Sequence, residues 1–166
     1  GTAGIVEFPG VLYRGGAEQK IRKYLIDNNY IDTVIQLPPD LFFGTSIATC
    51  IIVLKKSKKE NNILFIDASE EFVREGNKNK LSEENRKKIL DTFEKREDIE
   101  YFSKVVDNKD IGENDYNISV SSYVERKDTR EVIDIKELNK EIEEIVKRQN
   151  VLRESIDKIV REIEGE

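Results

Sequence analysis

Apolar residues recur at alternating spacings of three and four along the last part of the chain, and this pattern constrains the fold more than any other feature. The series is Ile135, Leu138, Ile142, Ile145, Gln149, Leu152, Ile156, Ile159 and Ile163, interrupted only by Gln149. It is the heptad repeat of a helix that packs along another helix. A helix over residues 134–164 would be about 46 Å long at about 1.5 Å per residue, longer than a small domain is wide.

A single helix cannot bury this stripe against itself. We therefore predict a projecting coiled-coil helix that binds a partner, and a polar residue such as Gln149 inside the seam would set its register or the number of helices. The predicted partner-binding residues are Leu138, Ile142, Ile145, Gln149, Leu152, Ile156, Ile159 and Ile163. The alternative is that the helix folds back and packs on its own domain.

Composition excludes several kinds of chemistry. The 166 residues include no His and one Cys, Cys50, so there are no imidazole ligands, no catalytic triads that need His, no internal disulfide and no thiolate zinc site. The chain also lacks a Gly-rich nucleotide-binding motif, a Walker A motif and a nucleophile elbow. We therefore assign no catalytic residue and no metal to this chain.

Charge and hydropathy limit the location and the partners. The net charge is −6, which disfavours a free-standing nucleic-acid binder but allows one face of a larger DNA-binding assembly. Neither end carries an apolar run of signal-peptide or membrane length. We expect a cytoplasmic protein without membrane association.

The first part of the chain has the pattern of an α/β fold. Residues 4–8 form an apolar, β-branched segment that predicts a buried strand, and residues 31–37 predict a second. Between them, residues 17–28 predict an amphipathic helix with Ile21 and Leu25 toward the core and Tyr24 on a flank. Its basic residues Lys20, Arg22 and Lys23 are predicted to face outward. Strand, helix and strand with short connections predict a right-handed parallel crossover.

The next strands are expected at residues 47–54 and 63–67. About eight residues separate them, which is too few for a helical crossover and predicts an antiparallel hairpin in a mixed sheet. Polar residues 71–80 predict a mobile loop. Ser82 is a good N-cap for a helix that extends to about Lys95 and buries Ile89, Leu90 and Phe93. Residues 101–106 and 118–124 are predicted as further strands.

Two loops are candidate binding sites because ligands of open α/β sheets bind beyond the carboxyl ends of parallel strands. The loop after the second strand carries Phe42, Phe43, Gly44 and Thr45, and an aromatic ring there can stack on a planar ligand. The alternative is that the rings pack beneath the sheet. Arg14, Gly15 and Gly16 follow the first strand and could hold a phosphate, although a solvated Arg beside a Gly-Gly turn is the simpler interpretation.

These segments resemble a known family. The run GVLYRGGAEQKIRKYLIDNNYIDTVIQLPPDLFFGTSIATCIIVLKK is similar to the modification (M) subunits of type I restriction-modification systems, which are gamma-class adenine-N6 DNA methyltransferases dependent on S-adenosylmethionine. The resemblance continues through ILFIDASEEF, LSEENRKKILDTFEKR and DYNISVSSYV, to about residue 130. It implies the C-terminal half of a Rossmann-like methyltransferase sheet, with the first strand as its fifth and the hairpin as its sixth and seventh.

The resemblance also implies a division of the chain and a set of roles. Residues 1–70 would be the methyltransferase sheet, residues 71–130 a helical and irregular extension, and residues 131–166 the heptad helix that docks on the specificity (S) subunit. Phe43 would pack on a flipped adenine, with Phe42 behind it and Gly44-Thr45 shaping the pocket wall. The restriction (R) subunit and duplex DNA would join the assembly.

Some residues depart from the family pattern. The glycine-rich cofactor motif and the Asn-Pro-Pro-Tyr/Phe catalytic motif would lie upstream of the first strand, and the segment from Leu37 to Asp40 lacks the Asn and the aromatic of the second motif. Ser46 and Ala48 stand where relatives often have Gly and Pro. We therefore expect the intact protein to transfer a methyl group from S-adenosylmethionine to adenine in duplex DNA, and these residues alone to be inactive.

Two other functions are consistent with the sequence. One is a non-catalytic binding or scaffold module that associates through its coiled-coil helix. The other is independent nucleic-acid binding by Lys20, Arg22 and Lys23, for which a solvated helix face is the simpler interpretation. Because the first strand is expected to be buried but lacks neighbours to cover it, we also expect the isolated residues to be marginally stable or to self-associate.

Overall fold

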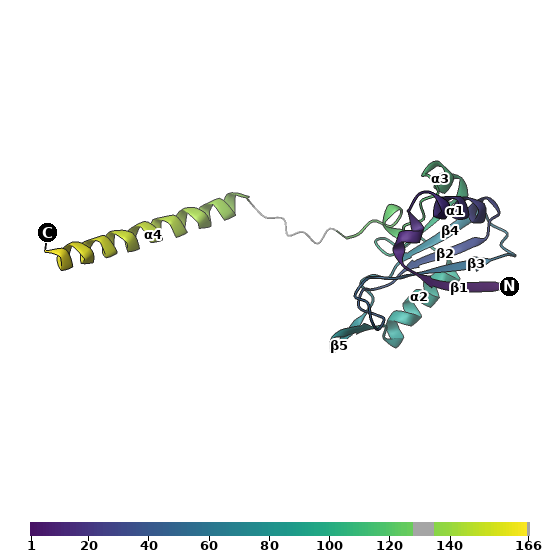
Figure 1. The fold of residues 1–166 in the computed structure, drawn as a ribbon, viewed down its shortest axis with the longest axis horizontal. Helices are drawn as coiled ribbons and strands as arrows, with labels where there is room; N and C mark the ends of the chain where they lie inside the picture. The colour runs from purple at the N-terminus through teal and green to yellow at the C-terminus, as the bar shows by residue number, and fades with distance from the viewer. Residues whose placement is uncertain (128–134, 166) are drawn as a thin grey trace. The chain divides into compact units, whose positions relative to one another are not determined.

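A computed structural model describes residues 1–127 and 135–165 of the chain, without the side chains of residues 135–138 and 164. The chain divides into two compact units, Gly1–Lys127 and Asp128–Glu166. The first unit contains a five-stranded mixed sheet with helices on both faces, and the second contains one long helix (Figure 1). The α/β class predicted from the sequence is confirmed.

The sheet has the strand order β1-β3-β2-β4-β7. Its strands are β1 (Thr2–Glu7), β2 (Ile31–Gln36), β3 (Cys50–Lys55), β4 (Asn62–Asp67) and β7 (Ser103–Asp107). β3 runs antiparallel to both of its neighbours, β1 and β2, and β4 runs parallel to β2. β7 pairs antiparallel with β4 at the far edge. The predicted mixed sheet with an antiparallel hairpin is present, and the hairpin consists of β2 and β3.

The predicted pairing of the third strand with the fourth is wrong, because β2 lies between β3 and β4. β3 ends beside the start of β2, where β4 also begins. The link over residues 56–61 therefore needs to pass only one strand, a distance of about 10 Å. It is held there by Lys58, whose Nζ donates to the Ile31 carbonyl at 2.7 Å. A short connection can therefore join two strands that have one other strand between them, as well as the two adjacent strands of a hairpin.

Helices cover the two faces of the sheet unequally. α1 (Ala17–Asp27) and the short α3 (Asn108–Glu113) pack on one face, together with the 3-10 turns η1 (Pro9–Leu12) and η2 (Val120–Ser122). α2 (Glu83–Lys95) packs on the other (Figure 1). α1 connects β1 to β2, which run in the same direction as predicted, although β3 lies between them.

β4 is the centre of the core and contributes to both faces. Ile63 and Phe65 pack under α1 and α3, while Leu64 and Ile66 pack under α2, and all four are fully buried. The alternation follows from the two-residue period of a strand. On the first face the Phe65 ring stacks on Tyr123, with ring centroids 4.4 Å apart.

The buried face of α1 differs from the predicted one. Ile21 and Tyr24 are exposed, whereas Arg22 and Ile26 are buried. Arg22 is accommodated because its guanidinium donates to the carbonyl oxygens of Tyr116 and Val11, each at 2.8 Å. A buried charge that is hydrogen-bonded in this way can replace an apolar residue on a helix face. The prediction that Arg22 faces outward is therefore wrong.

β1 is also more exposed than predicted. All six of its residues are exposed, including Ile5 and Val6, and the following Phe8 is exposed as well. β1 is an edge strand of the described sheet, so its outer edge carries unpaired backbone groups. The prediction of a buried strand is wrong for the residues that the structure describes.

Two other segments differ from prediction. Residues 71–80 contain a short hairpin of β5 (Val73–Glu75) and β6 (Lys78–Lys80) where a loop was predicted. The predicted strand over residues 118–124 is absent, because this segment turns through η2 and buries apolar side chains between turns. The predicted N-cap of α2 is confirmed, since the Ser82 hydroxyl accepts from the Asn85 amide. Leu90, however, is exposed.

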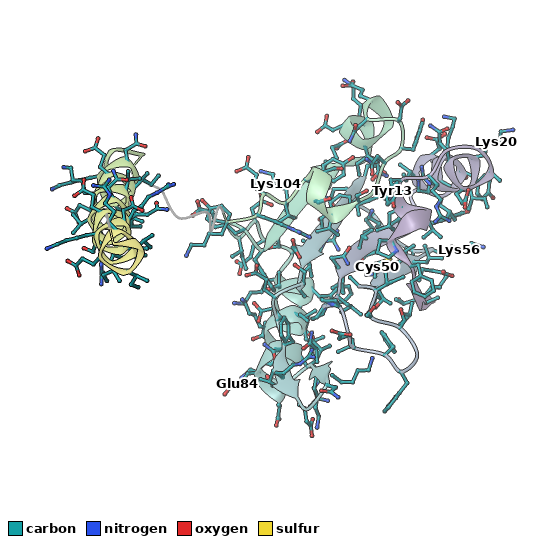
Figure 2. The ribbon with its side chains drawn as sticks, turned by 60° about the vertical axis from the view of Figure 1, so that its left-hand side comes forward. Tyr13, Lys20, Cys50, Lys56, Glu84 and Lys104 are labelled. Atoms are coloured by element: carbon teal, nitrogen blue, oxygen red, sulfur yellow. The ribbon has the colours of Figure 1, made fainter. Side chains whose placement is uncertain are left out.

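The second unit contains α4 (Ile135–Glu164), close to the predicted bounds. Each of its side chains that the structure describes is exposed, and Figure 2 shows them projecting all round the helix. The exposed apolar residues of the predicted seam are Ile142, Ile145, Leu152, Ile156, Ile159 and Ile163. The predicted contact residue Leu138 lies in the helix, but its side chain is outside the described set. None of the described helices combines the length and apolar composition needed to cross a membrane.

Candidate functional site at the carboxyl edge of the sheet

The carboxyl ends of β1, β2 and β4 lie together at one edge of the sheet. Glu7 and Gln36 both pair with Cys50, and Gln36 also pairs with Asp67. The connection after β1 and the loop after β2 therefore leave the sheet at the same edge (Figure 1). Both predicted candidate sites share this edge, although no hydrogen bond or ion pair joins the two loops in the part of the chain that the structure describes.

Residues 37–49, the connection between β2 and β3, are called the aromatic loop below. Phe43 lies at its outer part with 98% of its surface exposed, so its ring is not packed beneath the sheet. Phe42 is 40% exposed. Gly44 has a φ of 80°, a backbone conformation that residues other than glycine adopt rarely. The Thr45 hydroxyl accepts from the Ile47 amide at 3.1 Å and tightens the turn.

Hydrogen bonds that extend the pairing of β2 and β3 join the two ends of the aromatic loop. The Leu37 amide donates to the Thr49 carbonyl at 2.8 Å, and the Gln36 side chain donates to the same oxygen at 3.1 Å. The Thr49 hydroxyl is buried and has no hydrogen-bond partner among the described residues. The loop therefore starts from fixed positions at both ends.

The hairpin β5–β6 contacts the middle of the aromatic loop. Lys78 Nζ donates to the carbonyls of Phe42 and Thr45, at 3.1 and 3.2 Å. The Asn79 side chain donates to the Pro39 carbonyl at 2.8 Å, and its backbone amide donates to the Asp40 carbonyl at 3.1 Å. Sequence reasoning missed these residues. The dipeptide Gly76-Asn77 between two short segments was the signal that could have revealed the hairpin.

The second candidate site, Arg14-Gly15-Gly16, lies at the amino end of α1. Gly16 is the N-cap, with a φ of 75° and no side-chain cap for the first amides of the helix. Gly15 and Gly16 are exposed. The Arg14 guanidinium lies against Gly10, where a Cβ would stand 2.8 Å from Arg14 Cζ. Gly15 and Gly16 thus offer exposed amides near one cation, whereas the Arg14 amide donates to the Gly10 carbonyl at 3.0 Å.

The basic residues of α1 do not act together. Arg22 is buried and Lys23 is bound by Asp27 at 2.8 Å and by the Tyr116 hydroxyl at 2.6 Å. These bonds, chiefly the one with Asp27, raise the pKa of Lys23. Lys20 projects outward (Figure 2). With Arg22 inside the unit, the helix face does not present three cations to a nucleic acid.

Cys50 lies at the start of β3, also at this edge. It is buried, and burial raises the pKa of its thiol to about 11, with a further contribution from Glu7. A thiol with such a pKa remains protonated at neutral pH and is a poor nucleophile. No group of three or more carboxylate, thiol or imidazole side chains suited to a metal ion occurs among the described residues.

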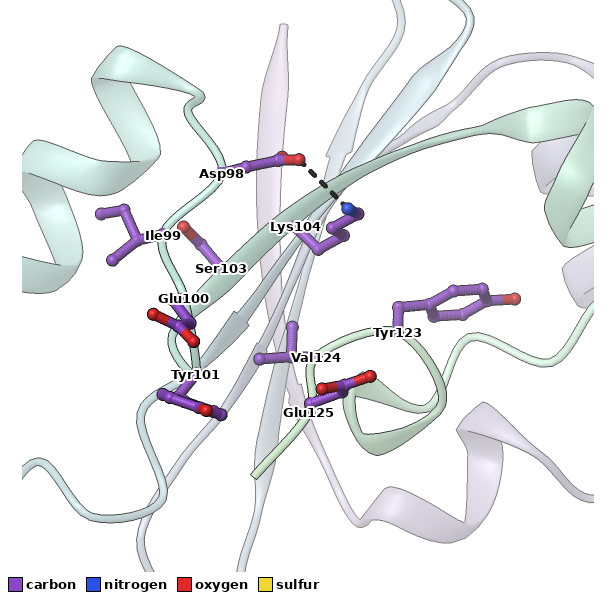
Figure 3. A pocket seen from close by; sticks show the side chains of 9 residues that line it. All are labelled: Asp98, Ile99, Glu100, Tyr101, Ser103, Lys104, Tyr123, Val124 and Glu125. Atoms are coloured by element: carbon purple, nitrogen blue, oxygen red, sulfur yellow. Dashed lines mark ion pairs between the residues drawn. The ribbon is translucent and has the colours of Figure 1, made fainter. Parts of the chain in front are cut away.

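A cavity of about 320 Å³ lies beside the start of β7, where Ser103 pairs with Ile66 near the carboxyl end of β4 (Figure 3). Lys104 pairs with Asp98 at 3.3 Å, and the hydroxyls of Ser103 and Tyr123 donate to backbone carbonyls outside the cavity. Glu100 and Glu125 also line it. Because the cation is paired and the remaining charges are negative, this cavity does not suit an anionic ligand, and we assign no site there.

Comparisons with known proteins give a consistent result. The family model described as N-6 DNA Methylase matches residues 1–132. The chain is 51% identical over 164 residues to the type I restriction enzyme MpnII methylase subunit of Mycoplasma pneumoniae, covering 98% of this chain and 30% of that protein. It is 41% identical over 168 residues to the MjaVII methylase subunit of Methanocaldococcus jannaschii, covering 98% of this chain and 29% of the relative.

Solved structures agree with these relatives. A type I restriction-modification methyltransferase subunit from Streptococcus thermophilus matches with a TM-score of 0.75 and 44% identity, over 76% of this chain and 27% of that one. The EcoKI M protein matches with a TM-score of 0.60 over 93% of this chain and 41% of that one, and its 16% identity shows the fold alone. The chain thus spans about 30% of the length of its curated relatives.

Proposed function

Because the chain belongs to the N-6 DNA methylase family, we propose that it acts as part of an adenine-specific DNA methyltransferase in a type I restriction-modification system. In a protein of its relatives' length, the enzyme would transfer a methyl group from S-adenosylmethionine to N6 of an adenine in duplex DNA. The residues of this chain would supply one wall of the pocket for the target base and the helix that docks on a partner subunit.

The observation that carries the proposal is the exposed Phe43 ring on a loop at the carboxyl edge of the sheet. An enzyme that modifies a base inside a duplex must first take the base out of the stack, and an aromatic platform offsets the stacking that is lost. Phe43 provides such a platform, with Phe42 behind it and Gly44 and Thr45 shaping the wall. Hydrogen bonds from the hairpin β5–β6 hold the carbonyls of Phe42 and Thr45 on either side of Phe43.

The methyl donor is assigned to residues outside this chain. S-adenosylmethionine supplies the methyl group, and its binding in a Rossmann-like sheet needs a glycine-rich turn between a strand and a helix. The turn after β1 does not fit this need, because the Arg14 guanidinium lies over Gly10 and the chain contains no G-x-G segment. In this proposal the chain contributes to the base pocket through the aromatic loop, and the donor site lies elsewhere.

Arg14, Gly15 and Gly16 are proposed to contact a phosphate of the DNA. The free amides at the amino end of α1 and the nearby guanidinium suit a phosphate oxygen. A contact of this kind adds affinity without reading the sequence. Replacing Arg14 by Ala would weaken binding to all duplexes alike and reduce the slope of log affinity against log salt by about 1.

The sheet is proposed to continue beyond β1 into the rest of a Rossmann-like sheet. The exposed residues Ile5, Val6 and Phe8 on and beside β1, together with Ile21 and Tyr24 on α1, support this. Both the open strand edge and these apolar side chains would be covered by the additional polypeptide that the relatives contain. Without it, pairing of β1 edges between copies would produce self-association of the isolated residues.

Helix α4 is proposed to dock on helices of the S subunit, in a complex that the R subunit and duplex DNA complete. The seam from Ile142 to Ile163 supports a coiled-coil contact. Val146 and Val160 each follow a seam residue directly and widen the apolar stripe beyond the two positions of a two-stranded coil. A stripe of this width suits a bundle of more than two helices.

Methylation by the intact protein tests the pocket. We expect Phe43→Ala to reduce the single-turnover methylation rate about 5- to 150-fold, because stacking of a base on an aromatic contributes about 1–3 kcal/mol. Tyr101→Asn is the matched control, since Tyr101 is an exposed aromatic outside the aromatic loop and Asn tolerates its positive φ of 60°. Unchanged methylation in the Phe43 variant would contradict the place of Phe43 in the base pocket, whereas no methylation by the wild-type protein would favour the scaffold function.

Co-purification with the S subunit tests the helix. Ile145→Asp places a charge in the seam and is expected to abolish the complex while residues 1–127 remain folded. Lys147→Asp introduces the same side chain two positions away, outside the seam, and should leave the complex intact. Recovery of the full complex with the Ile145 variant would contradict the docking proposal.

A further inference from the structure

We propose that the hairpin β5–β6 is a clamp that positions the aromatic loop, and that Lys78 is the residue through which it holds Phe43. The inference rests on the proposed role of Phe43 in binding the target base. Lys78 does not touch the base in this account, so it is a positioning residue rather than a catalytic one.

The first observation is where the ammonium group lies. Lys78 Nζ donates to the carbonyl of Phe42 at 3.1 Å and to that of Thr45 at 3.2 Å. These two carbonyls stand on either side of Phe43 and Gly44, so a single cation bridges the turn that carries the ring. Hydrogen bonds from a charged donor are stronger than those between neutral groups.

The second observation is that little else holds this turn. The Phe43 side chain is 98% exposed and therefore contributes almost no packing. Gly44 adds backbone freedom at a φ of 80°. Within the loop, the Thr45 hydroxyl accepts from the Ile47 amide at 3.1 Å and the Asp40 amide donates to the Ser46 carbonyl at 3.4 Å, but neither bond involves Phe43 or Gly44. The position of Phe43 therefore depends on Lys78 more than on its own surroundings.

The third observation is that the hairpin is itself anchored. Asn79 is 6% exposed and binds the Pro39 and Asp40 carbonyls, at the start of the aromatic loop. Its Oδ1 accepts from Arg74 at 2.9 Å, and Arg74 also reaches Asp40 at 3.4 Å. Asp40 adopts a positive φ of 56°, which these contacts help to hold. The clamp thus moves with the loop base and not independently of it.

This arrangement has a consequence for the reaction. If the Phe43 ring were mobile, a flipped base would bind in several positions. A misplacement of about 1 Å can reduce the reaction rate about a hundredfold. Fixing the backbone on both sides of Phe43 keeps the ring available before DNA binds. The expected result of loosening the clamp is slower methylation with the ring still present.

The experiment uses the intact protein with its partner subunits and a duplex that contains the target adenine. Lys78→Met removes the ammonium but keeps the stem, and we expect single-turnover methylation to fall about tenfold. Lys78→Arg retains donors and should restore most of the rate. Lys80→Met is the matched control, because Lys80 lies on the same hairpin and pairs with the exposed Glu75 at 2.9 Å. It should behave as the wild type.

A double variant shows whether Lys78 acts through Phe43. In the Phe43→Ala background, Lys78→Met should reduce the rate by less than about twofold, because coupled residues are not additive. An independent reduction of about tenfold in both backgrounds would overturn the proposal, and so would a wild-type rate for Lys78→Met when Phe43→Ala alone is slow. In that second case the proposed function stands without the clamp.

Hydrogen exchange gives a readout that does not depend on activity. The Asp40 amide, which donates to the Ser46 carbonyl, and the Ile47 amide, which donates to the Thr45 hydroxyl, should exchange faster in Lys78→Met than in the wild type, while the amides of β2 stay protected. Unchanged exchange at these two amides would overturn the clamp. If Phe43→Ala methylates normally, the proposed role of Phe43 in binding the target base is wrong, and the exchange measurement alone then decides whether the clamp exists.

Discussion

The sheet unit of residues 1–127 and the helix α4 place their apolar side chains differently. In the sheet unit, β4 buries four consecutive apolar residues between two layers of helices. In α4, six seam residues from Ile142 to Ile163 recur just as regularly, and all are exposed within their own unit. A periodic apolar pattern therefore determines the local structure, whereas burial depends on a surface for that face to meet.

Tyrosine makes this difference measurable. All six tyrosines of the chain lie between Tyr13 and Tyr123, and α4 contains none. Near-ultraviolet circular dichroism therefore reports on the packing of the sheet unit alone. Far-ultraviolet signal reports in addition on the helicity of α4. Each substitution below can be assigned to one region on this basis.

The largest effect is expected at the centre of the sheet. Phe65→Ala removes a fully buried ring that stacks on Tyr123 at 4.4 Å. We expect the free energy of unfolding of the sheet unit to fall by about 3–5 kcal/mol in urea denaturation. Ile145→Ala in α4 should leave that unfolding transition unchanged. A shift of the tyrosine signal by the Ile145 variant would mean that the two regions are not independent.

A smaller loss is expected from the buried ion pair of the sheet unit. Arg96 donates to Asp32 at 3.0 Å and to the Asn62 side chain at 2.9 Å, and Asp32 is buried. Arg96→Met would leave the Asp32 carboxylate buried without its partner. Because Arg96 is partly exposed, we expect a loss of about 2 kcal/mol, less than the 3–5 of a fully buried pair.

The matched control for Arg96 is its neighbour Lys95, whose pair with Glu97 is exposed on both sides at 3.8 Å. Lys95→Met should change the stability by less than about 1 kcal/mol. Equal losses for the two variants would show that burial of Asp32 is not what makes the Arg96 pair important.

Helix caps sharpen the comparison at a lower energy. Ser82→Ala removes the cap of α2, where the hydroxyl accepts from Asn85 at 3.1 Å, and should cost about 1 kcal/mol. The Ser155 hydroxyl in α4 instead donates to the Val151 carbonyl at 2.8 Å in the middle of the helix. Ser155→Ala should retain or increase helicity in the far ultraviolet, because Ala has the higher helix propensity. A loss of helicity would indicate that this bond stabilises α4.

A further difference is a pH dependence of stability. Burial lowers the pKa of Lys58 from 10.5 to about 8, against the opposing charge of Asp32. Between about pH 8 and 10.5 the unfolded chain then binds more protons at this residue than the folded one, so its contribution to stability rises with pH. The difference in unfolding free energy between the wild type and Lys58→Met should grow in the same direction. If plots of unfolding free energy against pH run parallel for the two proteins, the lowered pKa of Lys58 does not contribute to stability.

Sequence patterns predicted those elements whose cause is local. The cap at Ser82, the apolar period of β2 and the heptads of α4 each lie within one segment, and the structure contains all three elements near the expected bounds. Strand pairing and exposure depend on residues far along the chain. The position of β2 between β3 and β4, and the burial of Arg22 by carbonyls from Val11 and Tyr116, have no local signal.

The candidate site shows the same division. The aromatic loop and its Phe43 follow from a strand that ends before two aromatic residues, so the sequence alone could indicate them. The hairpin that holds the loop could not be assigned to it, because Lys78 is separated from Phe42 by 36 positions and from Thr45 by 33. The residues that a loop presents to a ligand are therefore visible in its own sequence, whereas the residues that fix its conformation come from a distant part of the chain.

The strand order also affects how a nascent chain can fold on the ribosome. Of the five strands of this sheet, β1 and β2 are synthesised before the others, yet β1 pairs with β3, and β2 pairs with β3 and β4. Until Cys50–Lys55 have emerged, neither strand can pair with β3, whereas α1 can form from local contacts. β3 must therefore be synthesised before this part of the sheet can assemble. A translational pause before that point would leave the apolar segments of β1 and β2 exposed, and exposed apolar segments are bound by chaperones.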